Sequence, residues 1–369
     1  MLQQHTNLNG MVSDCRLNLF DVEGKPKIKV NGLNTQISGF ACYLPPNLKT
    51  SEETIPFGTL PRGIDFKRLT RIESHHEVLE GQGSLELAVE AANKAIARSG
   101  VPKEEIDLVI SCSVTKLNSK LQNLIEPCLA SNISTALGIN AQNFDLANAC
   151  SGMVTGLMIA DRKIKAGKIR NALVVSGEYL TGALYEALDK NLLLNPKALA
   201  SLTIGDAGGA YVISRSEEDR IRFFEPITLA QHSQLCIGDA AIGRPGPAMR
   251  TESKKLQQGA LENLGEYLKR DMDGPEEWST HDHVISHQTT PRAVEKGAMV
   301  IEKALGHSDV VRSISDTGNT ASTSHVTVLE KLLDNGELKS NQKIYFIAFG
   351  SGLSLIGMNF YIPPGVEKW

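Results

Sequence analysis

The sequence lacks the features that mark several large classes of protein. Its six cysteines form no CxxC pair, which argues against both a zinc site and a disulfide framework. No run approaches the roughly 18 apolar residues of a membrane span, and the first residues lack the basic and apolar segments of an export signal. A net charge of −4 gives no reason to expect nucleic acid as a partner. We therefore expect a cytoplasmic protein with no bound metal and no membrane insertion.

What the chain does contain is an alternation of short apolar runs and amphipathic segments. With 41% hydrophobic and 22% charged residues, it has the composition of an ordinary globular protein. Apolar residues spaced by three and four predict a helix over 83–101 and a second over 291–306, which has proline in its first turn. Apolar runs that end in Gly or Ser read as strands between such helices. This alternation predicts an α/β fold with largely parallel sheets covered on both faces.

The length of 369 residues suits two similar halves. The first 35 residues are polar and are expected to form an appended arm, 1–35. A charged run near residue 215 follows a strand-like segment and predicts a boundary there, giving halves 36–215 and 216–369. Both halves are rich in βα units, which is consistent with an old duplication.

One cysteine stands out by its position. Cys150 lies in "FDLANACSGMVTG", where an apolar strand-like segment gives way to a helix. The unpaired N–H groups of a helix start favour the thiolate, so the pattern predicts an acidic, nucleophilic thiol. A lone cysteine in apolar surroundings is more often a small core residue, and the prediction therefore depends on other motifs.

Three later motifs supply possible partners for this thiol. His287 lies between a strand and a helix in "VISHQTTPR", and Asn319 lies in the turn "DTGNTAS" that opens another helix. Gly350 and Gly352 flank Ser351 in "FGSGL", a turn that can bring backbone N–H groups close to a reacting oxygen. Each motif alone has a plain structural explanation, namely packing, turn formation and a tight hairpin.

Together and in this order, these motifs resemble the thiolase superfamily, and specifically its β-ketoacyl-acyl carrier protein synthase III family. The resemblance begins near residue 36, reaches the C-terminus, and includes "GFACYLPPN", "ANACSGM", "IGDAGGAYVI", "HQTTPR", "DTGNTASTS" and "FGSGL". It implies two duplicated βαβ halves in a layered αβαβα arrangement, with buried central helices between the sheets. It also implies a homodimer.

The resemblance implies a cofactor-independent acyltransferase that acts on acyl-coenzyme A or acyl carrier protein thioesters. Cys150 would carry an acyl group, while N–H groups at Cys150 and in the Gly350–Ser351–Gly352 turn would hold the oxyanion. His287 and Asn319 would donate to the carbonyl of a malonyl-type thioester and stabilise the enolate left by decarboxylation. The product would be a β-ketoacyl compound of fatty-acid, polyketide or secondary-metabolite synthesis. Acyl transfer to oxygen or nitrogen is an alternative that Asn319 argues against.

The chain departs from the family pattern at the expected substrate-binding residues. "HQTT" stands where the family has HQAN, so that Thr290 replaces an asparagine, whereas Arg292 matches an arginine that in the family lies by the coenzyme A nucleotide. The family's tryptophan is missing from "FKRLTRIESHH", where Arg71 is the best remaining match. The choice between coenzyme A and carrier protein stays open. The apolar residues of 181–198 and 231–249 are expected either to line an acyl channel or to cover the core.

Glu126 falls where related enzymes place an apolar residue that reaches across the dimer to the partner's acyl pocket. A carboxylate there resembles the head-to-head condensing enzymes of olefin biosynthesis, in which a glutamate deprotonates an acyl α-carbon without decarboxylation. Burial would raise its pKa toward that of a useful base. Alternatively, Glu126 caps or solvates a helix that starts near Pro127. A catalytically silent partner subunit is a last alternative, against which the intact Cys150, His287 and Asn319 argue.

Overall fold

The computed structural model describes residues 33–56, 59–60, 65–190, 192, 195–272, 280–306 and 310–369. The predicted arm, 1–35, lies outside the described residues except for its last three. Two main sheets form the body of the protein. The first contains, in spatial order, β1 (Asn34–Tyr43), β7 (Ala207–Ser216), β6 (Asn171–Glu178), β4 (Leu108–Ser111) and β5 (Gln142–Asp145). The second contains β12 (His283–Ser286), β13 (Lys343–Gly350), β14 (Ser354–Tyr361) and β8 (Ile221–Phe223), with β9 (Ile227–Thr228) also paired to β14.

The two sheets repeat one strand order. In the first, β4 is parallel to β6, β6 is antiparallel to β7, and β7 is antiparallel to β1. In the second, β12, β13, β14 and β8 repeat these relations in the same sequence. A parallel bridge between Val284 and Val310 occupies the position that β5 has beside β4. The repeated order is what a duplicated βα-rich unit produces.

The prediction of largely parallel sheets is wrong, because both sheets are mixed. The parallel pairs are those joined through helices, as parallel strands require a long crossover. β13 and β14 are joined by residues 351–353 alone, and so short a connection makes the pair antiparallel. The two longest strands of the first sheet, β1 and its neighbour β7, also run antiparallel.

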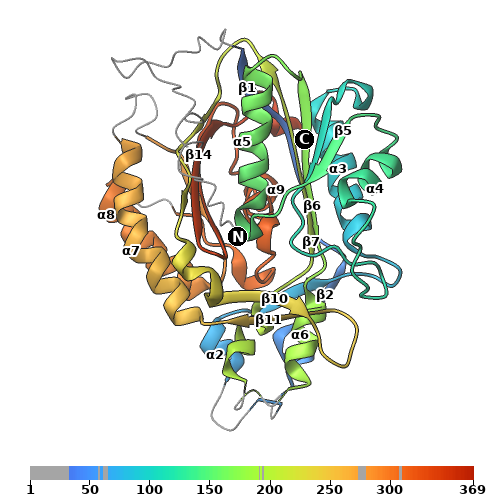
Figure 1. The fold of residues 1–369 in the computed structure, drawn as a ribbon. Coiled ribbons are helices and arrows are strands. Elements are labelled where there is room, and N and C mark those ends of the chain that lie inside the picture. Colours follow the sequence, from blue (N-terminus) through green and yellow to red (C-terminus); the bar gives the residue numbers. More distant parts are fainter. Residues whose placement is uncertain are drawn as a thin grey trace, which may run out of the picture.

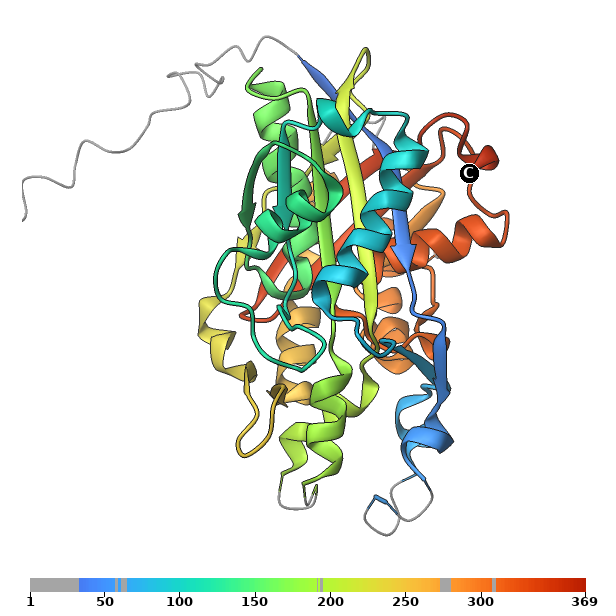
Figure 2. The same cartoon turned by 90° about the vertical axis from the view of Figure 1, so that its right-hand side faces the viewer.

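Three layers of helix enclose the two sheets (Figure 1). The central layer lies between the sheets, and its helices contact both of them. Figure 2 shows α3 lying across the outer face of the first sheet. The predicted layered αβαβα arrangement is therefore confirmed. The central helices are α5 (Gly152–Lys165) and α9 (Ser324–Asp334), those outside the first sheet are α3 (Ser84–Ser99) and α4 (Leu129–Leu137), and those outside the second are α7 (Ser253–Met272) and α8 (Pro291–Leu305).

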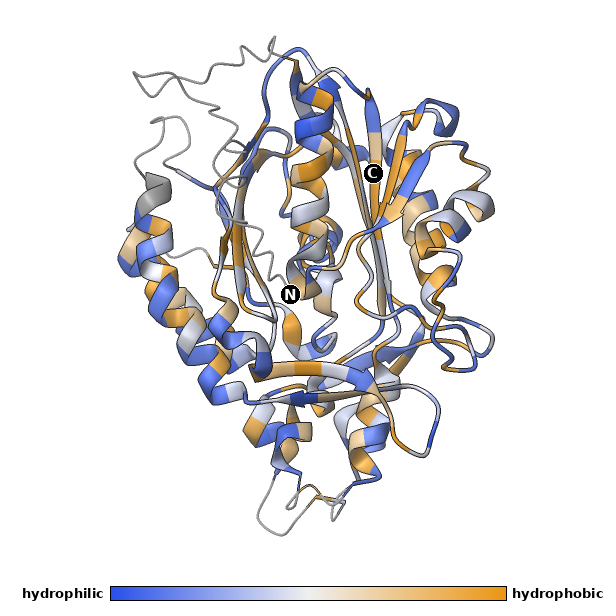
Figure 3. Ribbon diagram, in the orientation of Figure 1, coloured by the Kyte–Doolittle hydropathy of each residue, from blue (hydrophilic) through white to orange (hydrophobic). Residues whose placement is uncertain are grey.

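The helices form where the apolar periodicity predicts them. α3 covers most of the predicted 83–101 segment, and α8 covers nearly all of 291–306. Thr290 begins α8 by accepting a hydrogen bond from the Ala293 N–H at 3.2 Å, and Gly306, with φ of +75°, ends it. The outer helices α7 and α8 alternate hydrophilic and hydrophobic residues, as helices with one face on solvent do (Figure 3). α9, by contrast, is buried along nearly its whole length.

A smaller group of elements covers one end of the two sheets, seen at the bottom of Figure 1. It includes two short antiparallel ribbons and three short helices. These are β2 (Asn47–Thr50) with β3 (Ser74–Glu77), β10 (Cys236–Ala240) with β11 (Pro247–Thr251), α1 (Ser51–Thr54), α2 (Phe66–Thr70) and α6 (Thr181–Leu188). No helix in the described part of the chain is long and apolar enough to span a bilayer.

Candidate active site

Each central helix follows a short 3₁₀ turn, which we call an N-turn. The first N-turn is Ala149–Ser151, before α5, and the second is Ala321–Thr323, before α9. Each contains an alanine in the left-handed region, with φ of +45° at Ala149 and +49° at Ala321. Such a conformation costs on the order of 1 kcal/mol in a non-glycine residue and persists only where the surroundings hold it. The two N-turns contact each other, so the duplicated halves bring the same strained feature to one place.

Cys150 lies in the first N-turn, two residues before α5 begins. It is partly buried and packs against an apolar cluster, which we call the thiol cluster. The buried members of the cluster are Leu180, Ala183, Leu184, Ile204 and Ala321, and Leu188 and Met249 pack against them. Residues of both segments expected to line a channel or cover the core, 181–198 and 231–249, therefore surround the thiol.

The prediction of an acidic thiol is wrong for this structure. Burial raises the pKa of the Cys150 thiol, and negative charge on Cys236 or Glu178 would act in the same direction. The N–H groups of a helix start are visible in the sequence, but the apolar side chains that the fold packs around the sulfur come from distant segments. Before reaction, Cys150 therefore carries its proton at neutral pH.

Asn319 is held rigidly beside the second N-turn. Its side-chain Oδ1 accepts a hydrogen bond from the Ala321 N–H at 2.9 Å. Its backbone N–H donates to the Thr203 carbonyl at 2.7 Å, and its carbonyl accepts from the Gly205 N–H at 3.1 Å. Because the amide oxygen is engaged with the turn, the NH₂ group is the part of the amide that remains for a ligand.

His287 is attached to the start of α9. Its backbone N–H donates to the Ile347 carbonyl at 2.9 Å, and its ring Nδ1 lies 2.7 Å from the Ser324 hydroxyl. Burial, with the neighbouring His325, lowers the pKa of His287 to about 3, so the imidazole is neutral at physiological pH. Some polar atoms in the described part of the chain are buried without a hydrogen-bond partner, but Nε2 of His287 is not one of them. His287 therefore directs a neutral ring nitrogen toward the open side of the site.

The second N-turn joins the three segments that were singled out in the sequence. Ala321 packs in the cluster that contacts Cys150, and its N–H is bound by Asn319. Ser324, which directly follows the turn, is bound to His287. A thiol, an amide and an imidazole from segments far apart in the chain thus meet around one turn.

The "FGSGL" turn lies against the first N-turn. A Cβ on Gly350 would be 2.6 Å from the Ser354 hydroxyl and 2.8 Å from the Asn148 carbonyl, and closer still to the Ser151 hydroxyl. Ser151 donates to the Asn148 carbonyl at 2.7 Å, and its oxygen is 2.9 Å from that of Ser354. Gly352 has φ of +120°, which only glycine adopts readily. The turn is the tight β13–β14 hairpin, and it is also held against the turn that carries Cys150.

A second link of the same kind holds the second N-turn and was missed in the sequence. The Ser322 hydroxyl donates to the Glu178 carboxylate at 2.5 Å and lies 2.8 Å from the Ser176 hydroxyl. Glu178 also accepts from the backbone N–H groups of Val114 and Thr115, and burial raises its pKa. The available signal was a single charge at the end of the apolar run "ALVVSGE". Each N-turn is therefore bound to a strand of the other half.

Glu126 is exposed on the loop between β4 and α4. Among the described residues of a single subunit, it is not part of the thiol cluster. Of the two structural alternatives, capping is wrong, because α4 begins only at Leu129, whereas the exposed position of Glu126 fits the solvated alternative. The N–H groups of Leu129 and Ala130 donate to the Asp145 carboxylate at 3.0 and 2.9 Å. The neighbour of Glu126, Ile125, is 79% exposed, which is unusual for a large apolar side chain.

The expected substrate-binding residues gather at the start of α8. Arg71, at the end of α2, forms a 2.6 Å ion pair with Glu295 of α8, and both side chains are about half exposed. Arg292 is exposed in the first turn of the same helix. The Thr290 hydroxyl is engaged in capping the helix. The structure thus brings Arg71 to the helix that carries Arg292 and gives Thr290 a structural role.

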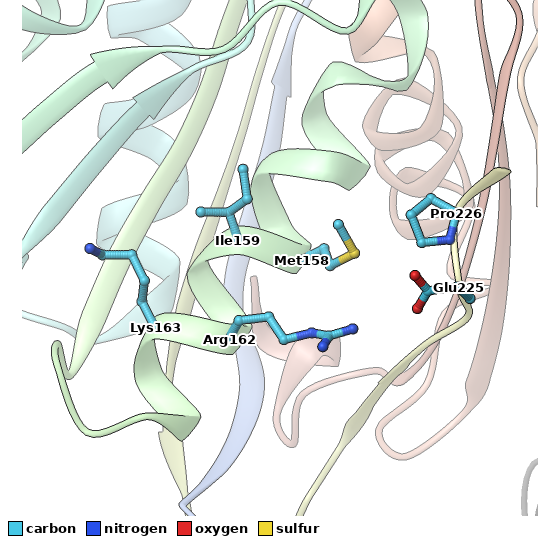
Figure 4. A pocket seen from close by; sticks show the side chains of 6 residues that line it. All are labelled: Met158, Ile159, Arg162, Lys163, Glu225 and Pro226. Atoms are coloured by element: carbon cyan, nitrogen blue, oxygen red, sulfur yellow. The ribbon is translucent and has the colours of Figure 1, made fainter. Parts of the chain in front are cut away.

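A shallow pocket lies elsewhere, along the exposed side of α5 (Figure 4). Arg162 points toward Glu225 across the pocket, while Lys163 points away (Figure 4). At a rise of about 1.5 Å per residue, this part of α5 is at least roughly 10 Å from Cys150. The pocket is therefore separate from the thiol cluster. Among the described residues, no group of side chains has the composition of a metal site.

The layered fold, with a cysteine, a histidine and an asparagine around the starts of its central helices, defines a thiolase-type condensing enzyme. Family models for 3-oxoacyl-[acyl-carrier-protein] synthase III match residues 144–229, and for its C-terminal part residues 277–362. By this likeness the chain is a ketosynthase III-like acyltransferase of the Claisen-condensing type.

Curated relatives and solved structures agree with this assignment. The chain is 26% identical over 328 residues to the β-ketoacyl-[acyl-carrier-protein] synthase III of Rickettsia massiliae, covering 87% of this chain and 98% of that protein. It is 26% identical over 330 residues to the same enzyme of Rickettsia rickettsii, with the same coverage. A cysteine-to-serine variant of Xanthomonas campestris OleA with bound lauric acid and lauroyl-CoA superimposes with a TM-score of 0.77 at 26% identity, covering 89% of this chain and 99% of that one. A glutamate-to-alanine variant of OleA gives a TM-score of 0.77 at 26% identity, with 89% and 98% covered.

Proposed function

We propose that the enzyme joins two acyl thioesters by a carbon–carbon bond, through an acyl group carried on Cys150. His287 and Asn319 hold the carbonyl of the second thioester. The observation that carries the proposal is that Cys150 packs in the cluster of Ala321, that Asn319 accepts from the Ala321 N–H, and that His287 is bonded to Ser324, directly after this turn. Each residue type suits one need of a Claisen condensation: a nucleophile to carry the acyl group, and two neutral donors for an enolate oxygen.

In the first step, the Cys150 sulfur attacks the carbonyl of the donor thioester. The tetrahedral oxyanion is held by backbone N–H groups of the first N-turn and of the Gly350–Ser351–Gly352 turn. The carbon–sulfur bond of the donor then breaks, and its thiolate takes the proton that Cys150 loses. Because burial raises the pKa of Cys150, this proton transfer accompanies the attack rather than preceding it.

In the second step, a malonyl-type thioester loses its carboxylate as CO₂. The electron pair of the broken bond enters an enolate whose oxygen accepts hydrogen bonds from Nε2 of His287 and the amide of Asn319. The α-carbon attacks the acyl group, the Cys150–carbon bond breaks, and the thiolate takes a proton from solvent water. The lowered pKa of His287 supports this role, because a neutral imidazole retains its donor without a charge to neutralise.

The thiol cluster supports an acyl chain as the group that Cys150 carries. Its side chains are aliphatic, and burying each CH₂ of a bound chain contributes about 0.8 kcal/mol. The exposed Arg292, and Arg71 beside the same helix, suit the phosphates of coenzyme A or of a carrier protein's prosthetic arm. A β-ketoacyl product of this kind belongs to fatty-acid, polyketide or related secondary-metabolite synthesis.

A second copy of the chain completes the proposed enzyme. Val114, Ile125 and Phe144 are 47%, 79% and 36% exposed and lie on the loop after β4 and on the edge strand β5. An unpaired strand edge beside exposed apolar side chains is a surface that another copy can cover. We therefore propose a homodimer that meets at β5.

A second candidate function is head-to-head condensation of two fatty acyl thioesters without decarboxylation. Its basis is Glu126, which does not cap a helix and is exposed beside the exposed Ile125, so that a partner subunit could receive it. The solved OleA variants, one with bound lauroyl-CoA and one with a substituted glutamate, add support from similar proteins. In this reaction the Glu126 carboxylate would take the α-proton of the acyl group.

One measurement separates the two candidates. Carboxyl-labelled malonyl thioesters, on coenzyme A and on carrier protein, are supplied with a panel of acyl donors, and labelled CO₂ is counted. Release that disappears in His287→Ala and persists in Glu126→Ala supports the decarboxylating enzyme and identifies the preferred carrier. Condensed product from acyl thioesters alone, without CO₂ and lost in Glu126→Ala, supports the second candidate instead. Neither CO₂ nor condensed product would overturn both.

A further inference from the structure

Two buried side chains at the start of α9 lie next to the His287 ring, and neither has a role in the function proposed above. Ser324 and His325 are each 2% exposed. The Ser324 oxygen is 2.7 Å from Nδ1 of His287, and in the described part of the chain this is its only hydrogen-bond partner. His325 lies parallel to His287, with ring centroids 6.2 Å apart and planes inclined by 25°.

Counting protons decides which atom of the Ser324–His287 pair donates. A hydroxyl has one proton, and a neutral imidazole has one ring proton. If Nδ1–H of His287 donated to Ser324, the buried hydroxyl proton would have no acceptor, and a buried polar group without a partner costs about 1–3 kcal/mol. If Ser324 donates to Nδ1, both groups are satisfied. The ring proton of His287 then resides on Nε2.

His325 fixes the strand to which His287 is attached. Its Nε2–H donates to the Ile347 carbonyl at 3.1 Å, and the same carbonyl accepts the backbone N–H of His287 at 2.9 Å. Its ring also packs on Phe346, with centroids 5.0 Å apart. The Ile347 carbonyl is therefore bound both by the ring of His325 and by the backbone of His287, and it fixes the two residues relative to β13.

Packing alone does not explain a histidine at position 325. In the described part of the chain its Nδ1 is buried without a hydrogen-bond partner, whereas an aliphatic side chain would fill the space without that cost. What the imidazole adds is the Nε2–H bond to Ile347. It also adds a neighbour that disfavours charge on His287, since two cations this close repel each other.

We propose that Ser324 and His325 are positioning residues that keep His287 neutral, with its proton on Nε2. Ser324 sets the tautomer of the His287 ring. His325 holds the Ile347 carbonyl, which also accepts the backbone N–H of His287. The inference rests on the proposed role of His287 as a hydrogen-bond donor to the enolate, because only the Nε2–H form presents a donor to the open side of the site.

The tautomer can be observed directly. Long-range proton–nitrogen NMR spectra of the full-length protein labelled with ¹⁵N-histidine distinguish Nδ1–H from Nε2–H rings, and the His287→Ala variant assigns the signal. We expect Nε2–H in the wild type, and an increased Nδ1–H fraction in Ser324→Ala. A wild-type ring protonated on Nδ1, or a Ser324→Ala spectrum identical to that of the wild type, would overturn the proposal.

Kinetics of the two half-reactions test the consequence for catalysis. Ser324→Ala should slow condensation about tenfold, the effect of one hydrogen bond, while acylation of Cys150 stays within about twofold. Ser324→Thr, which keeps the hydroxyl, should restore most of the rate. His325→Gln keeps an N–H that can donate to the Ile347 carbonyl, and it should catalyse condensation far faster than His325→Leu. Equal rates for Gln and Leu, or equal loss of acylation and condensation, would refute the positioning roles.

The NMR and kinetic experiments also distinguish a failure of this inference from a failure of the proposed function. A wild-type enzyme that condenses no thioesters, yet shows the Nε2–H ring and its loss in Ser324→Ala, would contradict the function and leave the positioning roles intact. A condensing wild type with an Nδ1–H ring would do the reverse.

Discussion

Gly350→Ala tests whether the close approach of the glycine turn to the first N-turn matters for acylation. The new methyl group would lie 2.6 Å from the Ser354 oxygen and 2.8 Å from the Asn148 carbonyl. The carbonyl is backbone, and the hydroxyls of Ser151 and Ser354 are 2.9 Å apart in a buried pair, so the clash is relieved only by moving the turns apart. Overpacking of this kind costs about 1–3 kcal/mol. A displacement of about 1 Å at reacting groups slows chemistry about a hundredfold.

We therefore expect Gly350→Ala to acylate about a hundredfold more slowly and to lose about 1–3 kcal/mol of stability. Single-turnover acylation of Cys150, followed by intact mass, gives the rate, and urea unfolding gives the stability. Gly297→Ala in α8 is the matched control, because none of the described atoms lies within 4 Å of its added Cβ. It should acylate normally and gain about 0.5–1 kcal/mol. Wild-type acylation by Gly350→Ala would refute the reasoning.

Four further outcomes are expected. Cys150→Ala should form no acyl adduct by mass, and a persisting adduct would identify another nucleophile. His287→Ala should still acylate but not condense, and equal loss of both steps would assign His287 to thiol activation. The pKa values of the buried His287 and His325 are lowered to about 3 and about 4, so between pH 7 and pH 5 these residues bind protons only in the unfolded state. Each therefore lowers the free energy of unfolding by about 2 kcal/mol over this range. Asp206, with its pKa raised to about 6, binds a proton when folded and offsets about 1 kcal/mol. For these three groups together, urea unfolding should show a loss of roughly 2–3 kcal/mol, which an unchanged stability would contradict. Thr290→Ala should lose about 1 kcal/mol with unchanged kcat/KM, and a raised KM would mean that Thr290 binds substrate.

Local patterns in the sequence were sufficient to predict α3 and α8, whereas the layered fold was implied by the family resemblance. The apolar stripe of α3 and the Pro291 start of α8 are features of a few consecutive residues, and both helices occur where predicted. Strand direction was not predictable in the same way. It depends on how β1 and β7, more than 160 residues apart, lie beside each other, and no local pattern reports that.

For the candidate site, the sequence pointed to the proposed reacting groups but not to the residues that hold them. Cys150, His287 and Asn319 were recognisable because each opens a helix or follows a strand within a characteristic motif. The bond between Ser151 and Ser354 joins residues 203 positions apart, and that between Ser322 and Glu178 joins residues 144 apart. Serines at such separations carry no periodic signal. The pKa of Cys150 was mispredicted for the same reason, since the side chains that bury it come from distant segments.

The exchange of hydrogen bonds between the halves has a consequence for biosynthesis. The turn that carries Cys150 is bound to Ser354, at the start of β14, which follows every other strand in the described part of the chain. On the ribosome, the nucleophile is made more than 200 residues before the strand that holds its turn. A nascent N-terminal half therefore lacks the Ser354 partner of this turn, and the turn that carries Cys150 gains that hydrogen bond only after β14 has been made.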